Sequence, residues 1–289
     1  MFRRKRIHRV LFSFILPFGC VFFAQYLSAS SASGDALRQL PEGLGNPSVH
    51  KLSANVWAIT GLYHTAGSRG YSVNAGIITT EKSIVFIDSG MTINSAEYIW
   101  RIAQEKMPEY DKLYLILTHH HSDHAFGMRV FKEKGAQIIA PRGVGEELRD
   151  DNGKYKSFIA EKMGWDSKRA DEILGEVVIS VPDRTIERDE TLDIDGEKIQ
   201  LLVTPGHVPD EIAVYHPRSQ TLFAGDGLYE GMDLTIHFGG PGQWRQWIVQ
   251  LERLKKLSLR AIVPGHGNLC STSEIDRNMD YLANRLKRN

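Results

Sequence analysis

The sequence predicts an α/β protein in which two β-sheets pack together and helices cover their outer faces. Short β-branched runs followed by a helix occur in the first half of the chain, and the same order recurs in the second half. Of the 289 residues, 42% are hydrophobic, so the chain can build a sizeable core. Each sheet must bury its apolar face against another layer, so two such halves favour two packed sheets with helices outside.

The elements follow from hydrophobic periodicity and from turn residues. Residues 113–117 form a continuous apolar run with the length of a fully buried strand. Residues 93–107 have a helical pattern, with Asn94 or Ser95 as the expected cap and Pro108 as the end. The other predicted strands are 56–60, 73–79, 84–88, 137–140, 192–194, 198–203, 212–215, 221–224 and 261–263, and the other predicted helices are 126–134, 145–164, 243–257 and 274–287.

Residues 1–30 have the order of a secretory signal peptide. A run with five basic and no acidic residues precedes the apolar stretch 10–27, and small residues follow it. An uncleaved membrane anchor is the alternative, although Pro17 and Gly19 make a poor spanning helix. We therefore predict a periplasmic or secreted protein without stable membrane association after cleavage. Residues 31–50 are predicted to be a linker or loosely packed arm, and residues 51–289 to be one domain.

The charge and cysteine counts exclude several classes of protein. The chain has 35 basic and 35 acidic residues, and its zero net charge argues against a partner such as nucleic acid. Five of the basic residues lie in the leader, so the rest of the chain has a net charge of −5. Two cysteines cannot form a disulfide scaffold or a four-thiolate zinc site. Any metal ion must therefore be bound mainly by nitrogen and oxygen.

A cluster of histidines follows the predicted buried strand, where four of the eleven histidines fall within six residues. Side chains alternate in an extended segment, so His119 and His121 should point the same way while His120 points elsewhere. If the chain then turns into a helix, Asp123 and His124 reach the same cavity. This set of side chains suits Zn²⁺ or a similar divalent ion. A histidine-rich surface loop that binds metal adventitiously is the alternative.

Three later strands each end in a polar residue beside glycine. They are followed by His207 in Thr-Pro-Gly-His, Asp226 in Ala-Gly-Asp-Gly and His266 in Pro-Gly-His-Gly. Glycine lets the backbone turn sharply, and loops at one end of a sheet are where functional groups collect. One such residue would be a turn residue or a hydrogen-bonded core group, which is our interpretation of His216. Four sites in order, with five histidines and two aspartates, are hard to explain by chance.

The run His-x-His-x-Asp-His, followed by His207, Asp226 and His266, resembles the metallo-β-lactamase superfamily from about Val56 to the C-terminus. The resemblance implies the four-layer αββα sandwich of these metallohydrolases. It also implies that Asp88 supports the histidine loop without binding metal. By this resemblance, His119, His121 and His207 bind one metal ion, Asp123, His124 and His266 bind a second, and Asp226 bridges the two.

The resemblance further implies the chemistry. The cofactors would be two Zn²⁺ ions, with iron or manganese as alternatives, and two such ions lower the pKa of a shared water to about 7. The resulting hydroxide would attack the carbonyl of a small-molecule ester, thioester, lactone or amide, or less readily a phosphoryl group. Asp123 is the expected catalytic residue, because it can orient the hydroxide and relay its proton. Arg69, Tyr229 and His237 are expected to contact the substrate.

The branch of the superfamily stays open. Residues 204–215 resemble the zinc β-lactamases, but those enzymes have Cys, and Lys three residues later, where this chain has Asp226 and Tyr229. The missing cation removes a contact worth about 1.5–3 kcal/mol, so only weak β-lactamase activity is expected. Glyoxalase II shares the bridging Asp, but only 23 residues follow His266, too few for its helical domain. The motifs are also compatible with a mononuclear iron persulfide dioxygenase and with a non-catalytic accessory protein of an exported redox pathway.

Overall fold

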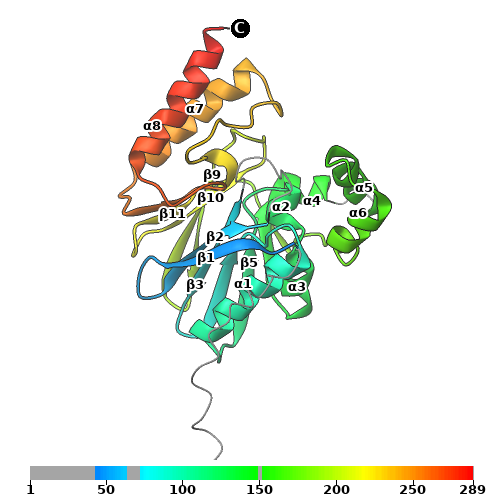
Figure 1. The fold of residues 1–289 in the computed structure, drawn as a ribbon. Helices are drawn as coiled ribbons and strands as arrows, with labels where there is room; N and C mark the ends of the chain where they lie inside the picture. The colour runs from blue at the N-terminus through cyan, green and yellow to red at the C-terminus, as the bar shows by residue number, and fades with distance from the viewer. Residues whose placement is uncertain (1–42, 64–71, 149–151, 289) are drawn as a thin grey trace, which may run out of the picture. The chain divides into compact units, whose positions relative to one another are not determined.

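The computed structural model describes residues 43–63, 72–148 and 152–288, and they form two sheets with helices on both outer faces (Figure 1). The strand order is β1-β2-β3-β4-β5-β6-β7 in the first sheet and β12-β11-β10-β9-β8 in the second. The strands are β1 Gly45–Lys51, β2 Val56–Leu62, β3 Val73–Thr79, β4 Ser83–Ile87, β5 Lys112–Ile116, β6 Gln137–Pro141, β7 Arg184–Ile186, β8 Glu190–Ile194, β9 Glu197–Val203, β10 Ile212–His216, β11 Thr221–Phe223 and β12 Ala261–Val263. The helices are α1 Ile93–Lys106, α2 Ser122–Ala125, α3 Met128–Glu133, α4 Arg142–Glu147, α5 Asn152–Lys162, α6 Ser167–Leu174, the 3₁₀ turn η1 Gly225–Gly227, α7 Pro241–Lys255 and α8 Thr272–Leu286.

Three apolar clusters hold these layers together. Inward-facing residues of both sheets form the middle cluster, which includes Val85 of β4 and Val214 of β10. Alternate residues of β4, such as Phe86, pack instead against α1 and α3 on the outer face of the first sheet. Trp247 and other residues of α7 and α8 cover the outer face of the second sheet. Because both faces of β4 are buried, its sequence is a continuous apolar run rather than an alternating one.

The direction of the strands brings several loops to one end of the two sheets. β4, β5, β6 and β7 are parallel, and so are β11 and β12. Parallel strands place their carboxyl ends at the same edge, so the loops after β4 and β5 are neighbours. On the second sheet, the loops after β9, β11 and β12 open at the corresponding end. The backbone N–H of Asn74, at the start of β3, donates to Gly265 O at 3.0 Å and joins the two sheets there.

The predicted fold class is confirmed, and four local predictions need correction. The single helix predicted over 145–164 corresponds to two helices, α4 and α5. The cap of α1 is Thr92, because its hydroxyl oxygen accepts the backbone N–H of Ser95 at 3.1 Å. The predicted helix 126–134 begins earlier and is divided at Gly127 into α2 and α3. The linker interpretation is wrong for residues 45–50, which belong to β1 and pair with β2. This edge strand is mostly exposed, so its sequence lacks the apolar alternation by which a strand is predicted.

Two further elements, α6 and β7, have no counterpart in the prediction. α6 begins after Asp166, whose carboxylate accepts the N–H of Arg169 at 2.8 Å. The predicted leader and the start of the predicted linker lie outside the described residues. Among the residues that are described, no helix has the length and apolar character needed to cross a membrane.

Candidate metal centre

The predicted ligands lie on four loops that meet at one end of the sheets. His119, His121, Asp123 and His124 follow β5, and the last two lie in the short helix α2. His207 follows β9, Asp226 lies in the 3₁₀ turn after β11, and His266 follows β12. Within each of two groups, the atoms available for metal binding lie within 4.8 Å of one another. The first group is His119, His121, His207 and Asp226, and the second is Asp123, His124 and His266.

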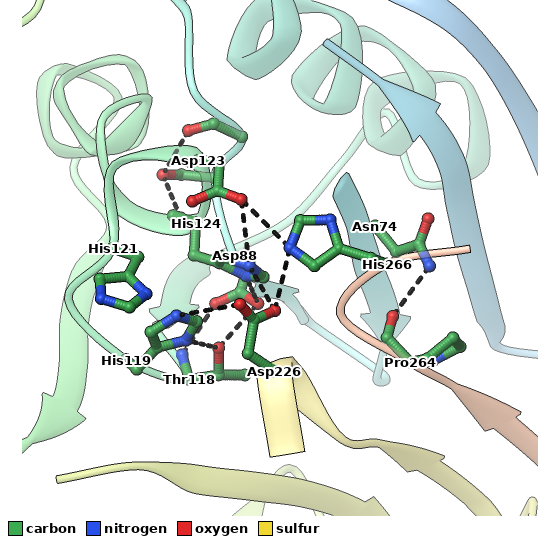
Figure 2. A network of polar contacts seen from close by, with 12 residues as sticks. Asn74, Asp88, Thr118, His119, His121, Asp123, His124, Asp226, Pro264 and His266 are labelled. Atoms are coloured by element: carbon green, nitrogen blue, oxygen red, sulfur yellow. Dashed lines mark hydrogen bonds and ion pairs between the residues drawn. The ribbon is translucent and has the colours of Figure 1, made fainter. Parts of the chain in front are cut away.

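Asp226 lies between the two groups, and Figure 2 shows its carboxylate among the rings of His119, His124 and His266. Oδ1 faces the second group, at 3.0 Å from His124 Nε2 and 3.2 Å from His266 Nε2. Oδ2 faces the first group, at 3.3 Å from His207 Nε2 and 3.7 Å from His119 Nε2. Each carboxylate oxygen is therefore directed to a different group, as a bridging ligand requires.

In two histidines of this centre, a hydrogen bond from Nδ1 to a carbonyl oxygen fixes the orientation of the ring. His207 Nδ1 lies 3.1 Å from Thr235 O, and His266 Nδ1 lies 3.0 Å from Ser72 O. A carbonyl oxygen can only accept, so it fixes the proton on Nδ1 and leaves Nε2 as the metal-binding atom. His121 Nδ1 lies 2.9 Å from His207 Nε2, so these two rings face each other within the first group.

Several buried polar atoms in the centre lack a regular hydrogen bond. Within the described residues, His119 Nε2, His124 Nε2 and Asp226 Oδ1 are fully buried and make no hydrogen bond of regular geometry. An orphaned buried polar atom costs about 1–3 kcal/mol, so several of them converging on one point need a common partner. Imidazole and carboxylate together are ligands for Zn²⁺ and similar ions. The residues present therefore fit a metal centre.

Asp88 supports the histidine loop from below. Its Oδ1 accepts the backbone N–H of Thr118 at 2.7 Å, and its Oδ2 accepts the Thr118 hydroxyl at 2.9 Å. The same Oδ2 lies 2.8 Å from His124 Nδ1. Asp88 has a backbone φ of 58°, in the left-handed region that aspartate adopts more readily than most residues. It thereby fixes the orientation of the His124 ring and of the chain that leads to His119.

The electrostatics differ between the two groups. Burial lowers the pKa of His119 and His121 well below the usual range, and it lowers the pKa of His207 to about 4. These three imidazoles are therefore neutral near pH 7, as metal ligands must be. Burial also disfavours the charged form of His266, but Asp226 and Asp123 outweigh it and raise its pKa to about 10.

The same pattern of loops and side chains occurs in a known family. A family model described as the metallo-beta-lactamase superfamily matches residues 68–266. The chain belongs to this superfamily. Members of the superfamily are metal-dependent hydrolases, and the groups that could hold metal in this member are the two described above.

Relatives of the chain within the metallo-beta-lactamase superfamily include enzymes with different names. A metallo-beta-lactamase type 2 of Elizabethkingia meningoseptica is 22% identical over 240 residues, which are 81% of this chain and 84% of that protein. A hydroxyacylglutathione hydrolase, GloC, of Haemophilus influenzae is 27% identical over 206 residues, 70% of this chain and 88% of that protein. A solved metallo-beta-lactamase from Pontibacter korlensis shares the fold, with a TM-score of 0.61, 22% identity and coverage of 83% and 100% of the two chains.

The match to GloC bears on the short segment after His266. The 23 residues after His266 argue against a glyoxalase-type hydrolase only if every enzyme of this type has the helical domain of glyoxalase II. The match with this chain covers 88% of the length of GloC. The match therefore leaves a hydrolase of this type among the alternatives for this chain.

The three predicted substrate contacts have different positions. Arg69 lies outside the described residues. Tyr229 is only 2% exposed, and its hydroxyl donates to Asp226 Oδ2 at 2.8 Å, so it contacts a predicted ligand rather than open solvent. His237 is exposed, and its ring lies 4.1 Å from that of Phe238. The Phe238 ring is itself 4.4 Å from His121, which places residues 237–238 beside the first group.

Two residues without a role in the sequence prediction also contact the ligand loops. Glu211 is fully buried beneath the turn that carries Asp226. Trp247 of α7 donates its Nε1–H to Gly227 O at 2.8 Å. Glu211 stands four residues after His207, but its contact with η1 depends on long-range packing. No local sequence signal indicates such a contact.

Proposed function

We propose that this protein is an exported hydrolase with two metal ions that attacks the carbonyl of a small-molecule ester, thioester, lactone or amide. One observation carries the proposal, namely that the two carboxylate oxygens of Asp226 face two separate groups of ligands. Two divalent ions bound there would supply a water with a pKa of about 7 and stabilise negative charge on the attacked oxygen. His119, His121 and His207 would hold one ion, and Asp123, His124 and His266 the other.

The chain's own residues would orient the reaction. Asp123 Oδ2 lies 3.3 Å from His266 Nε2, at the edge of the second group, so it can accept the proton of the attacking water. The Tyr229 hydroxyl donates to Asp226 and fixes the orientation of that carboxylate. Asp88 in turn fixes His124. These contacts would keep the metal ligands and the base in one geometry, and positioning of this kind can contribute strongly to the rate.

Substrate class follows from what the site contains and what it lacks. The Lys that pairs with the antibiotic carboxylate in thiol-bridged zinc β-lactamases is replaced by Tyr229, which is buried. Strong β-lactam hydrolysis is therefore not part of the proposal. Relatives named as an acylglutathione hydrolase and as a β-lactamase have names that describe carbonyl substrates, which supports a carbonyl rather than a phosphoryl substrate. The signal-peptide pattern of residues 1–30 supports a periplasmic or secreted location.

Metal analysis of the purified protein, combined with a substrate panel, tests this function. The panel contains a lactone, a thioester, a β-lactam and a phosphodiester. We expect two zinc ions per chain and hydrolysis of at least one carbonyl substrate that stops when a chelator removes the metal. One iron per chain with uptake of oxygen would instead identify a persulfide dioxygenase. A fully loaded protein that hydrolyses nothing in a widened carbonyl panel would favour the non-catalytic accessory role.

A further inference from the structure

Glu211 is a buried acid that the proposed mechanism does not use. It lies directly before β10 and its exposed fraction is 0%. Burial of a carboxyl group costs several kcal/mol of desolvation unless polar contacts offset it, and an apolar residue would fill the same space without this penalty. Burial, reinforced by the charge of Asp226, raises the pKa of Glu211 well above its usual range. The contacts of Glu211 with the ligand loops indicate a role for its side chain.

The carboxyl group of Glu211 lies against two of the loops that carry predicted metal ligands. A Cβ atom at Gly225 would be 3.3 Å from Oε1, and one at Gly227 would be 3.8 Å from both oxygens. The backbone N–H groups of Gly227 and His207 are directed to the carboxyl group, although their geometry falls short of regular hydrogen bonds. The Glu211 side chain thus lies against the backbone of two ligand loops, at His207 in one and next to Asp226 in the other.

The backbone around Glu211 extends this connection to a third loop. Its carbonyl oxygen accepts the N–H of Thr204 at 2.9 Å, at the start of the His207 loop. The next N–H, of Ile212, donates to Thr118 O at 2.9 Å, directly before His119. Residues 211–212 therefore join the loops of His119, His207 and Asp226. These are the loops that must keep a fixed separation if three histidines and one carboxylate are to share an ion.

Trp247 holds the same two loops from the side of α7. Its Nε1–H donates to Gly227 O at 2.8 Å, while a Cβ at Gly206 would lie 2.6 Å from its ring. The peptide groups of Gly227 are thus contacted by Trp247 at the carbonyl and by Glu211 at the N–H. Gly206 and Gly227 flank the ligands His207 and Asp226, so both contacts act one residue away from a ligand.

We propose that Glu211 is a positioning residue, whose carboxyl group sets the separation of the His207 and Asp226 loops for metal binding. The inference rests on the proposed function only in that the centre binds metal. A carboxyl oxygen can accept an N–H in either protonation state, whereas an amide nitrogen can never accept one. Glu211→Gln therefore removes one acceptor and places a donor against an N–H, and Glu211→Leu removes both acceptors at similar size.

The test measures the affinity for Zn²⁺ by competition with a chromophoric chelator. Contacts that orient metal ligands are typically worth 10–100-fold in metal affinity. We expect Glu211→Gln to weaken binding of the first Zn²⁺ by about tenfold and Glu211→Leu by up to about a hundredfold. The absorption spectrum of the Co²⁺-loaded protein should change in both variants, because the ligand geometry changes. Unfolding of the metal-free proteins is followed in parallel.

Glu197→Leu is the matched control, because Glu197 is also a buried glutamate of the second sheet, at 5% exposed, and contacts no predicted ligand. It should lower stability and leave Zn²⁺ affinity and the Co²⁺ spectrum unchanged. If Glu211→Gln binds Zn²⁺ within twofold of the wild type with an unchanged spectrum, the inference is overturned, whether or not Glu211→Leu folds. Failure of the wild-type protein to bind Zn²⁺ would instead overturn the proposed function.

Discussion

The described residues include two buried clusters of histidine and carboxylate, and the two clusters satisfy their polar atoms in opposite ways. In the cluster at the far end of β10, His216 Nε2 lies 2.7 Å from Glu197 Oε1, and Nδ1 lies 2.7 Å from Ser219 Oγ. Both ring nitrogens have a partner within the protein. In the metal centre, His119 Nε2 and His124 Nε2 have no hydrogen bond of regular geometry within the described chain.

The difference separates a structural cluster from a functional one. Buried polar atoms cost free energy unless they are paired, so a self-contained cluster stabilises the fold without any ligand. A cluster whose ring nitrogens converge on one carboxylate without hydrogen bonds of regular geometry can be completed by a bound ion. Residue type does not make this distinction, since both clusters contain buried histidine and carboxylate. The two clusters are distinguished by the direction of their side chains and by whether both ring nitrogens of each histidine form hydrogen bonds.

The largest effect is expected from Asp226→Ala. This change removes the carboxylate that faces both groups, so the two-metal arrangement should be lost while the sheets remain. Metal-based stabilisation of charge is worth several kcal/mol, so kcat/KM should fall by at least about 10³-fold. The measurement is kcat/KM on whichever carbonyl substrate the wild type hydrolyses, with metal content and circular dichroism recorded for each protein.

Glu197→Ala is the counterpart in the self-contained cluster. Its kcat/KM should remain close to that of the wild type at a temperature where it is folded. A metal-loaded Asp226→Ala protein with most of the wild-type activity would contradict the bridging role of this residue. Loss of activity in folded Glu197→Ala would contradict the separation of the two clusters.

A smaller effect is expected from Asp88→Asn. Asparagine has the same size and tolerates the positive φ of this position. Its NH₂ group would face His124 Nδ1, where the carboxylate oxygen now lies at 2.8 Å, and would favour the tautomer with the proton on Nε2. His124 could then not bind metal through Nε2. We expect affinity for the second Zn²⁺ to fall by about 10–100-fold.

Asp195→Asn controls for the chemical change in that experiment. Asp195 also has a positive φ, of 52°, but it accepts hydrogen bonds from Thr80 and Ser83 at a turn that contains no predicted ligand. Its substitution should leave Zn²⁺ affinity unchanged in the same chelator competition. Equal affinity in Asp88→Asn and Asp195→Asn would show that Asp88 does not orient His124.

The sequence predicts most of the fold because it depends on local patterns, and the residues that the resemblance names as ligands lie together in the structure. Apolar runs such as 113–117 identify the buried strands, and alternation correctly separates His119 and His121 from His120, which belongs to neither ligand group. The sequence does not predict β1, because this exposed edge strand is held by pairing with β2 rather than by its own apolar side chains. Tertiary pairing determines this element, and no local pattern records it.

The contacts that complete the site could not be predicted in the same way. The sequence predicts that Tyr229 contacts substrate, and it does not indicate that the Tyr229 hydroxyl donates to Asp226 or that the side chain is buried. Glu211, directly before β10, and Trp247, in α7, both contact Gly227. These residues are far from Gly227 in the sequence, so no spacing rule predicts their contacts. The sequence predicts an ordinary structural role for His216, which precedes a Pro turn, and the structure buries it between Glu197 and Ser219. Side-chain direction in the folded state determines all four.

The smallest effect concerns the pH dependence of stability that His216 contributes. Burial lowers the pKa of His216 below its usual value of 6.5, Glu197 opposes this shift, and Arg218 adds to it. Below about pH 6.5 the unfolded chain therefore binds a proton that the folded chain resists. The stabilisation is fully present above this pH and is lost as the pH falls towards the lower pKa of the folded state. Each unit of lowering corresponds to about 1.4 kcal/mol.

The measurement compares the wild type with His216→Gln by urea unfolding in the presence of a chelator at pH 7.5 and 5.5. Other titrating groups, including those of the metal centre, are common to both proteins and cancel in the difference. The wild type should lose more free energy of unfolding than the variant between the two values of pH. An equal loss would mean that Glu197 balances the burial of His216 completely, and the self-contained cluster would then be as stable in acid as at neutral pH.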